Sequence, residues 1–170
     1  KIPVLNGVIY SDIREKLIQL FGGQLSHIII GGAPFNADVE DFLIKIKFPF
    51  CVGYGMTECA PLISYTDYWA FKPRSYGRAL APYMEIKVDS PDPFNIPGEL
   101  LTRGENVMLG YYKNERATRE ILDDDGWLHT GDMVTIDDTD TIFIRGRCKS
   151  MILGPNGQNI YPEEIEAKLN

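Results

Sequence analysis

The chain has 170 residues, of which 44% are hydrophobic and 24% charged, and its formal net charge is −7. This composition predicts a globular protein with a real core, built as one domain or as one domain plus a piece of another. It contains no apolar run near the roughly 18 residues of a membrane-spanning helix and no basic cluster of the kind that binds nucleic acid. We expect no signal peptide. The three cysteines, Cys51, Cys59 and Cys148, are too scattered for a disulfide framework or a zinc site, so we expect a reducing, cytoplasmic compartment.

The first sixty residues alternate between helical and buried-strand patterns. Residues 11–22 predict a helix capped by Ser11, and the apolar run at 25–30 predicts a strand buried on both faces. Asn36 can cap a second helix, and residues 48–52 form a second apolar run. Strand, helix and strand in under thirty residues indicate a βαβ unit, so we expect the two strands to be parallel.

The second half of the chain carries shorter, alternating patterns. We expect strands at 84–89, 99–103, 133–136 and 141–144, a loop at 90–97, a turn at 123–126 and a helix from Asn114 to Leu122. Such short strands predict a small antiparallel sheet or barrel. After a turn-rich stretch at 154–157, a final helix begins at Pro162 and has barely started when the chain ends, so the sequence is expected to be an excerpt of a longer protein.

Two loops follow the predicted parallel strands, at the edge where ligands bind in open α/β sheets. They are Gly31-Gly32-Ala33-Pro34 and Gly53-Tyr54-Gly55-Met56-Thr57-Glu58. In the second loop, Tyr54 offers a ring for stacking a base, Thr57 a hydroxyl for a phosphate oxygen, and Glu58 a carboxylate for Mg²⁺. On spacing alone, an ordinary turn before a helix, with Glu58 as a solvated charge, explains the loop as well.

Two further positions can contact a nucleotide. Asp132 follows a tight glycine and can accept hydrogen bonds from two sugar hydroxyls, and Arg147 is a planar cation suited to hydroxyl and phosphate contacts. The alternatives are a turn aspartate and a solvated strand end. The two histidines, His27 and His129, are expected to be structural, because no nucleophile accompanies them and a hydrolase triad has no support.

Taken together, these residues resemble the AMP-forming acyl-activating enzymes, a family of acyl-CoA synthetases, luciferases and peptide-synthetase adenylation domains. The motifs occur in family order: Gly31 to Pro34, Gly53 to Glu58, Gly98-Glu99-Leu100 with Gly110-Tyr111-Tyr112, His129-Thr130-Gly131-Asp132, Gly146-Arg147-Cys148-Lys149, and Gly157 to Glu166. The segments from Gly53 to Ser64 and from Gly157 to Glu166 look most like those of bacterial long-chain fatty acyl-CoA synthetases.

The resemblance implies a ligase that uses ATP and Mg²⁺ to activate a fatty acid as acyl-AMP. Coenzyme A then takes the acyl group, and AMP and pyrophosphate are released. The implied nucleotide-binding residues are Gly32, Ala33, Pro34, Gly53, Tyr54, Gly55, Met56, Thr57, Asp132 and Arg147. Tyr54 would stack on adenine, Thr57 would bind the α-phosphate, Glu58 would hold Mg²⁺, Asp132 and Arg147 would bind the ribose, and Lys149 would be a hinge. Thr57 and Glu58 are the implied catalytic residues.

The resemblance also implies a mixed α/β fold in three parts. Residues 1–75 would end a parallel-sheet nucleotide-binding subdomain, residues 76–148 would form a small β-barrel-like subdomain, and residues 149–170 would begin a C-terminal α+β domain. The family's phosphate loop, its C-terminal lysine and most of its acyl pocket are missing, so we expect this polypeptide alone to be inactive. Peripheral membrane contact of the full-length enzyme is compatible with a fatty acid substrate. The alternatives are a non-catalytic nucleotide-binding or interaction module and an adenylation domain that loads a carrier-protein thiol.

Overall fold

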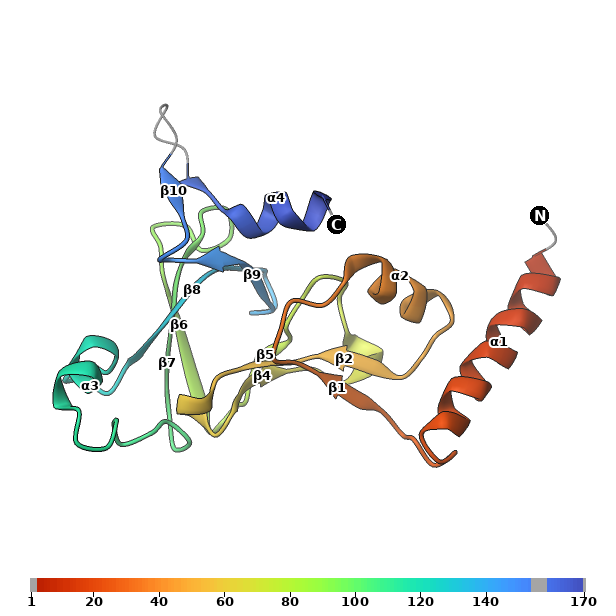
Figure 1. The fold of residues 1–170 in the computed structure, drawn as a ribbon, viewed down its shortest axis with the longest axis horizontal. Helices are drawn as coiled ribbons and strands as arrows, with labels where there is room; N and C mark the ends of the chain where they lie inside the picture. Colours follow the sequence, from red (N-terminus) through yellow and green to blue (C-terminus); the bar gives the residue numbers. More distant parts are fainter. Residues whose placement is uncertain (1–2, 154–158, 170) are drawn as a thin grey trace.

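The computed structural model describes residues 3–153 and 159–169 and has the mixed α/β fold that the sequence predicts (Figure 1). The first half contains α1 (Pro3–Leu20), β1 (Ile28–Ile30), α2 (Ala37–Lys45), β2 (Phe50–Val52), β3 (Tyr54–Gly55), η1 (Thr57–Cys59), β4 (Leu62–Tyr65), η2 (Tyr68–Ala70) and β5 (Arg78–Ala79). The second half contains β6 (Met84–Asp89), β7 (Gly98–Gly104), α3 (Glu115–Ile121), β8 (Leu128–Ile136), β9 (Ile142–Arg147), β10 (Ile152–Leu153), β11 (Asn159–Ile160) and α4 (Pro162–Leu169).

The βαβ unit forms as predicted. Strands β1 and β2 pair in parallel, with Ile28 opposite Phe50, and α2 connects them. Asn36 caps α2, because its Oδ1 accepts hydrogen bonds from the backbone amides of Asp38 and Val39, at 3.0 and 3.1 Å. The cap places the loop 31–34 directly between β1 and α2, at the carboxyl end of the parallel pair (Figure 1).

Three expectations for this first part are wrong. Helix α1 begins at Pro3, eight residues before the predicted cap at Ser11, and Gly7 lies inside it. Strand β1 is not buried on both faces, because Ile29 is 40% exposed. His27 belongs to the run at 25–30 that was predicted to be buried, yet it lies just before β1 and is exposed, with its ring stacked near Tyr68. An apolar run identifies a strand, but it does not say which of its faces another element covers.

Two antiparallel sheets make up the second part. Strands β6, β7, β8 and β9 form a four-stranded meander, and β3, β4 and β5 form a smaller sheet. Both sheets contribute to one hydrophobic cluster, whose fully buried members include Ile63 from β4, Leu100 from β7 and Leu128 from β8. The sequence predicted either a small antiparallel sheet or a barrel. Strands β6 and β9 are the two edges of the four-stranded sheet and do not pair with each other, so the structure has the sheet. The predicted boundary between residues 75 and 76 runs through this shared cluster.

The segment between η2 and β5 joins the two parts through ionic hydrogen bonds. Glu40 of α2 is 2% exposed, and its Oε1 accepts from the backbone amide of Arg74 at 2.7 Å and from Arg74 Nη1 at 2.8 Å. Two residues earlier, Lys72 Nζ donates to Asp137 Oδ2 at 2.6 Å, in the turn between β8 and β9. One short segment thereby connects α2 to the antiparallel sheet.

The Asp137 contact predicts a pH-dependent contribution to stability. Burial alone would raise the pKa of Asp137, but hydrogen bonds from Lys72, from the Thr139 hydroxyl and from two backbone amides outweigh it and lower the pKa well below its ordinary value. A carboxyl whose folded pKa is depressed stabilises the protein above its unfolded pKa of about 4, and this stabilisation is lost as the pH falls toward the folded pKa. We therefore expect Asp137→Asn to cost about 1–2 kcal/mol of unfolding free energy at pH 7.

Urea unfolding from pH 7 down to pH 2 measures this difference. The gap between wild type and Asp137→Asn should stay constant down to about pH 4 and then shrink. Asp138→Asn is the matched control, since Asp138 is exposed and forms no hydrogen bond or ion pair within residues 3–153 and 159–169. A gap that does not depend on pH would show that the charge of Asp137 contributes nothing.

Candidate nucleotide-binding site

Asp132 is held in place by a bulge in the four-stranded sheet. Along β7 and β8, Glu99 pairs with Met133 while Leu101 pairs with His129, so β8 carries two more residues than β7 between these pairs. Gly131 takes up this extra length with a φ of +72°, a conformation that favours glycine. The amide of Asp132 donates to Thr130 Oγ1 at 3.1 Å, and this hydroxyl donates to the Leu100 carbonyl at 2.7 Å. The bulge turns the Asp132 side chain toward the smaller sheet.

Glu99 supports the same bulge from β7. Its Oε1 accepts from the Gly131 amide at 3.0 Å, and its Oε2 lies 3.0 Å from His129 Nδ1. His129 is thus structural, as predicted from the sequence, although its partner could not be named there. Glu99 belongs to the motif Gly98-Glu99-Leu100, for which the sequence predicted no role. The structure shows that this carboxylate braces the loop that carries Asp132.

Tyr54, Asp132 and Arg147 form a hydrogen-bonded group between the two sheets. The Tyr54 hydroxyl donates to Asp132 Oδ2 at 2.6 Å, and Arg147 Nη1 donates to Asp132 Oδ1 at 2.7 Å. Tyr54 and Asp132 are each only 8% exposed, whereas the Arg147 side chain is 58% exposed. A carboxylate has about four acceptor positions, so Asp132 can accept two further hydrogen bonds after these two. The guanidinium beside it reaches toward solvent, where a ligand can approach.

The charges of this group reinforce one another. Burial, and then the neighbouring Asp132 carboxylate, raise the pKa of Tyr54 well above its ordinary value, so its phenol stays a hydrogen-bond donor. The hydrogen bond to Asp132 and its charge raise the pKa of Arg147, which stays a cation. Tyr54 was predicted to stack on a base. That role stays a prediction, and the structure adds a second one, which is to orient the Asp132 carboxylate.

The two glycine-containing loops meet at the carboxyl end of β1 and β2. The Gly53 amide donates to the Ile30 carbonyl at 2.8 Å, and a Cβ atom on Gly31 would lie 3.1 Å from the Gly53 carbonyl oxygen. Gly32, Ala33 and Pro34 follow on the exposed side of this contact. The structure therefore brings together the predicted site residues of both loops, and Tyr54 links them to Asp132 and Arg147.

Glu58 lies at the other end of the second loop, in the one-turn helix η1. Its side-chain Oε1 accepts from the Tyr111 hydroxyl at 2.6 Å, and its carbonyl accepts from the Met108 amide at 2.8 Å. Thr57 beside it is exposed, and Met56 packs against the hydrophobic cluster. Sequence reasoning missed the contact with Tyr111, although the motif Gly110-Tyr111-Tyr112 was a signal that pointed to it.

The remaining sequence-based expectations have simple outcomes. Lys149 is exposed in the turn between β9 and β10, and its role as a hinge stays a prediction. The stretch 154–157, including the start of the last motif, lies outside the described residues. Cys51, Cys59 and Cys148 are all unpaired, in line with the expected lack of disulfides. Among the helices of residues 3–153 and 159–169, none is long and apolar enough to span a membrane.

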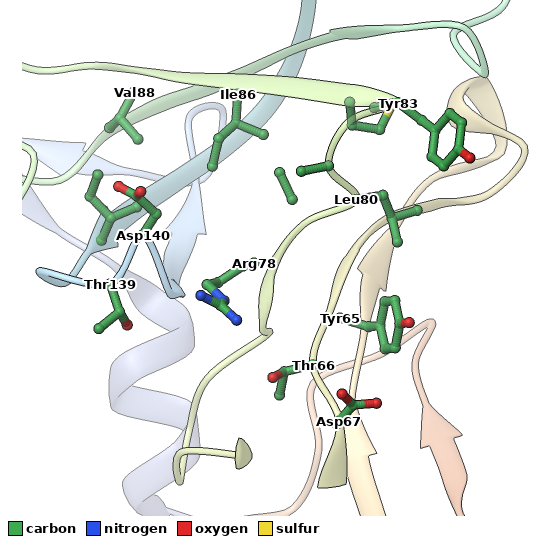
Figure 2. Close-up of a pocket in the computed structure, with 14 residues that line it drawn as sticks. Tyr65, Thr66, Asp67, Arg78, Leu80, Tyr83, Ile86, Val88, Thr139 and Asp140 are labelled. Carbon is green, nitrogen blue, oxygen red and sulfur yellow. The ribbon is translucent and has the colours of Figure 1, made fainter. Parts of the chain in front are cut away.

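A separate hollow of about 780 Å³ lies between the smaller sheet and β6 (Figure 2). Ile86 and Val88 of β6 line one wall, and Figure 2 shows Arg78 pointing into the space between Thr139 and Thr66. No residue predicted to bind the nucleotide lines this hollow. The candidate site is therefore the open surface around Asp132 and the two loops, and not this pocket.

Comparison with known proteins agrees with this geometry. The family described as AMP-binding enzyme matches residues 7–112. The chain is 38% identical over 154 residues to 4-coumarate–CoA ligase 5 of Oryza sativa subsp. japonica. This alignment covers 84% of the chain and 28% of the relative. O-succinylbenzoate coenzyme A synthetase (MenE) from Bacillus subtilis, in complex with ATP and magnesium ion, superimposes with a TM-score of 0.74 at 26% identity, over 91% of this chain and 34% of that one. Its complex with the acyl-adenylate intermediate OSB-AMP gives the same TM-score, over 90% of this chain. The chain thus spans about a third or less of the length of these relatives.

Proposed function

This chain belongs to the AMP-binding enzyme family, and from that premise we propose that it supplies the adenine, ribose and metal side of the site of an ATP-dependent acid–thiol ligase. The full-length protein would join an acid to ATP as an acyl-adenylate and pass the acyl group to coenzyme A. The observation that carries the proposal is the group of Tyr54, Asp132 and Arg147, which holds a buried carboxylate beside an exposed cation at the end of the loops. Its neighbours in structure include complexes with ATP and with an acyl-adenylate.

The residues of the chain bind and orient the nucleotide. The two free acceptor positions of Asp132 suit the two ribose hydroxyls, and Arg147 braces them from the solvent side. Gly32, Ala33 and Pro34 would lie along the base, and Thr57 would donate to the α-phosphate. In the proposed reaction the carboxylate of the acid attacks the α-phosphate and pyrophosphate leaves, with no covalent enzyme intermediate. Catalysis then rests on positioning and on charge neutralisation.

Glu58 fits the role of a Mg²⁺ ligand. No group of three or more His, Cys, Asp or Glu side chains that could hold a metal occurs in the part of the chain that the structure describes. Mg²⁺ needs no such cage, since it binds through one or two carboxylates, several waters and substrate phosphates. Glu58 provides one carboxylate whose Oε2 has no hydrogen bond to the described residues. When bound, the ion would neutralise charge on the phosphates.

The identity of the acid has two candidates. The motifs favour a long-chain fatty acid, and with such a substrate we also propose peripheral membrane contact of the full-length enzyme. The relatives instead include ligases named for 4-coumarate, an aromatic acid, and for 2-succinylbenzoate. We keep the fatty acid as the first proposal and the aromatic acid as the second. We also propose the three-part division at residues 75 and 148, with Lys149 as the hinge, and a cytoplasmic location.

Pyrophosphate release by the protein from the complete reading frame tests the proposal. With ATP, Mg²⁺ and coenzyme A, one panel of fatty acids and one of aromatic acids should be compared, and only acid-dependent release counts. Mass spectrometry of the thioester distinguishes coenzyme A from a carrier-protein thiol. Polypeptide 1–170 should release no pyrophosphate. Clear turnover by this polypeptide would contradict the expectation that it is inactive alone, and AMP binding without turnover by the complete protein would favour a non-catalytic module.

A further inference from the structure

A single loop, residues 104–112 between β7 and α3, holds Glu58 at two points. Tyr111 donates to its Oε1 at 2.6 Å, a length typical of a hydroxyl bound to a charged carboxylate, and the Met108 amide donates to its carbonyl at 2.8 Å. The partners are 53 and 50 residues away along the chain. The side chain and the main chain of Glu58 are therefore both oriented by one distant segment.

That loop is itself anchored at two further points, one on the turn after Glu58 and one on α3. Asn106 Nδ2 donates to the carbonyls of Cys59 and Leu62, at 2.6 and 3.0 Å, which clamps the turn that follows Glu58. The Tyr111 amide donates to Thr118 Oγ1 of α3 at 2.9 Å. Tyr111 is thus fixed through its backbone, and its phenol is a pre-positioned donor. A side chain placed this way sets the direction of the carboxylate it binds.

We propose that Tyr111 is a positioning residue that holds Glu58 for a divalent cation. The inference rests on the proposed function and deepens it. By occupying Oε1, the phenol leaves Oε2 as the free oxygen and removes the rotation that a glutamate in a surface turn otherwise has. Tyr111 is 38% exposed, so its hydroxyl lies at the surface where a nucleotide–metal complex can reach the pair. Partners of this kind, one step behind a metal ligand, change metal affinity by about 10- to 100-fold when removed.

Tyr111→Phe in the complete protein tests this assignment, because it removes only the hydroxyl. We expect the Mg²⁺ concentration for half-maximal pyrophosphate release to rise about tenfold, with little change in the KM for the acid. A second readout is Mn²⁺ binding in the presence of a non-hydrolysable ATP analogue, followed by electron paramagnetic resonance, which should weaken by a similar factor. Tyr112→Phe is the matched control, since Tyr112 is 88% exposed. Its ring contacts Lys113, and its hydroxyl forms no hydrogen bond within the described residues.

The outcomes separate this inference from the proposed function. If wild type releases pyrophosphate and Tyr111→Phe behaves like Tyr112→Phe in both metal readouts, the positioning role is overturned and the proposed function stands. If wild type neither releases pyrophosphate nor binds Mn²⁺ with the analogue, both fail together. A loss of folding would appear as a lower melting temperature. In that case Tyr111→His, which keeps a ring and a donor, should recover metal binding if the donor matters, and an unrecovered metal affinity would overturn the role.

Discussion

Replacing Asp132 by alanine should abolish tight AMP binding and also destabilise the protein. Two hydrogen bonds from ribose hydroxyls to a carboxylate are each worth about 1.5–3 kcal/mol, so their loss should weaken AMP binding by roughly 100-fold or more. The same substitution leaves the buried Tyr54 hydroxyl without its acceptor, which should cost about 1–3 kcal/mol of unfolding free energy. Arg147 adds little to that cost, because its exposed guanidinium is solvated instead.

A second substitution separates the two effects. Calorimetry with AMP and urea unfolding should be run on Asp132→Ala, on Tyr54→Phe and on the double variant. Removing the Tyr54 hydroxyl also removes the unsatisfied donor, so the double variant should be more stable than Asp132→Ala alone, a coupling that a double-mutant cycle isolates. AMP binding should not recover in the double variant. Recovery of binding there would show that Asp132 acts through the fold and not through contact with the ribose.

Local chemistry explains which parts of the fold could be predicted. The cap at Asn36, the parallel pairing of β1 and β2 and the start of α4 at Pro162 depend on neighbouring residues, and each appears in the structure as expected. The start of α1 could not be predicted in the same way, since Ser11 carries the features of a cap and yet lies inside a longer helix. The exposure of Ile29 was equally hidden, because coverage of a strand depends on elements far away in sequence.

In the candidate site too, the sequence predicted the residues that contact a nucleotide but not the distant partners that orient them. The residue types of Tyr54, Asp132 and Arg147 pointed to a nucleotide, and the structure brings the three together across 78 and 15 residues of chain. The partners that orient Asp132 and Glu58 could not be predicted, because Glu99 and Tyr111 act over 32 and 53 residues. A carboxylate and a phenol at such separations show no pattern of their own. Their role becomes visible only when a bulge or a loop brings them beside the side chain they orient.

A large effect on folding is expected at Gly55. A Cβ atom there would lie 2.1 Å from the Pro61 carbonyl oxygen and 2.9 Å from Leu62 Cα. These are backbone atoms, and the same Pro61 carbonyl accepts from the Met56 amide at 2.8 Å, so neither partner can move without opening the turn. We therefore expect Gly55→Ala to cost about 3 kcal/mol or more of unfolding free energy, at the upper end of what overpacking causes. Because this turn carries Glu58, metal-dependent activity should fall with it.

Alanine substitutions at two other glycines test whether steric contact causes the loss of stability expected for Gly55→Ala. A Cβ atom on Gly131 would meet nothing within 4 Å, but the φ of +72° makes alanine strained by about 1–2 kcal/mol. A Cβ atom on Gly7 would also meet nothing, and within helix α1 alanine should stabilise the protein by up to about 1 kcal/mol. Urea unfolding of the three alanine variants should rank Gly55 as most costly, Gly131 next and Gly7 as neutral or favourable. Equal costs at Gly55 and Gly131 would mean that the turn opens freely, and Glu58 would then not be rigidly placed.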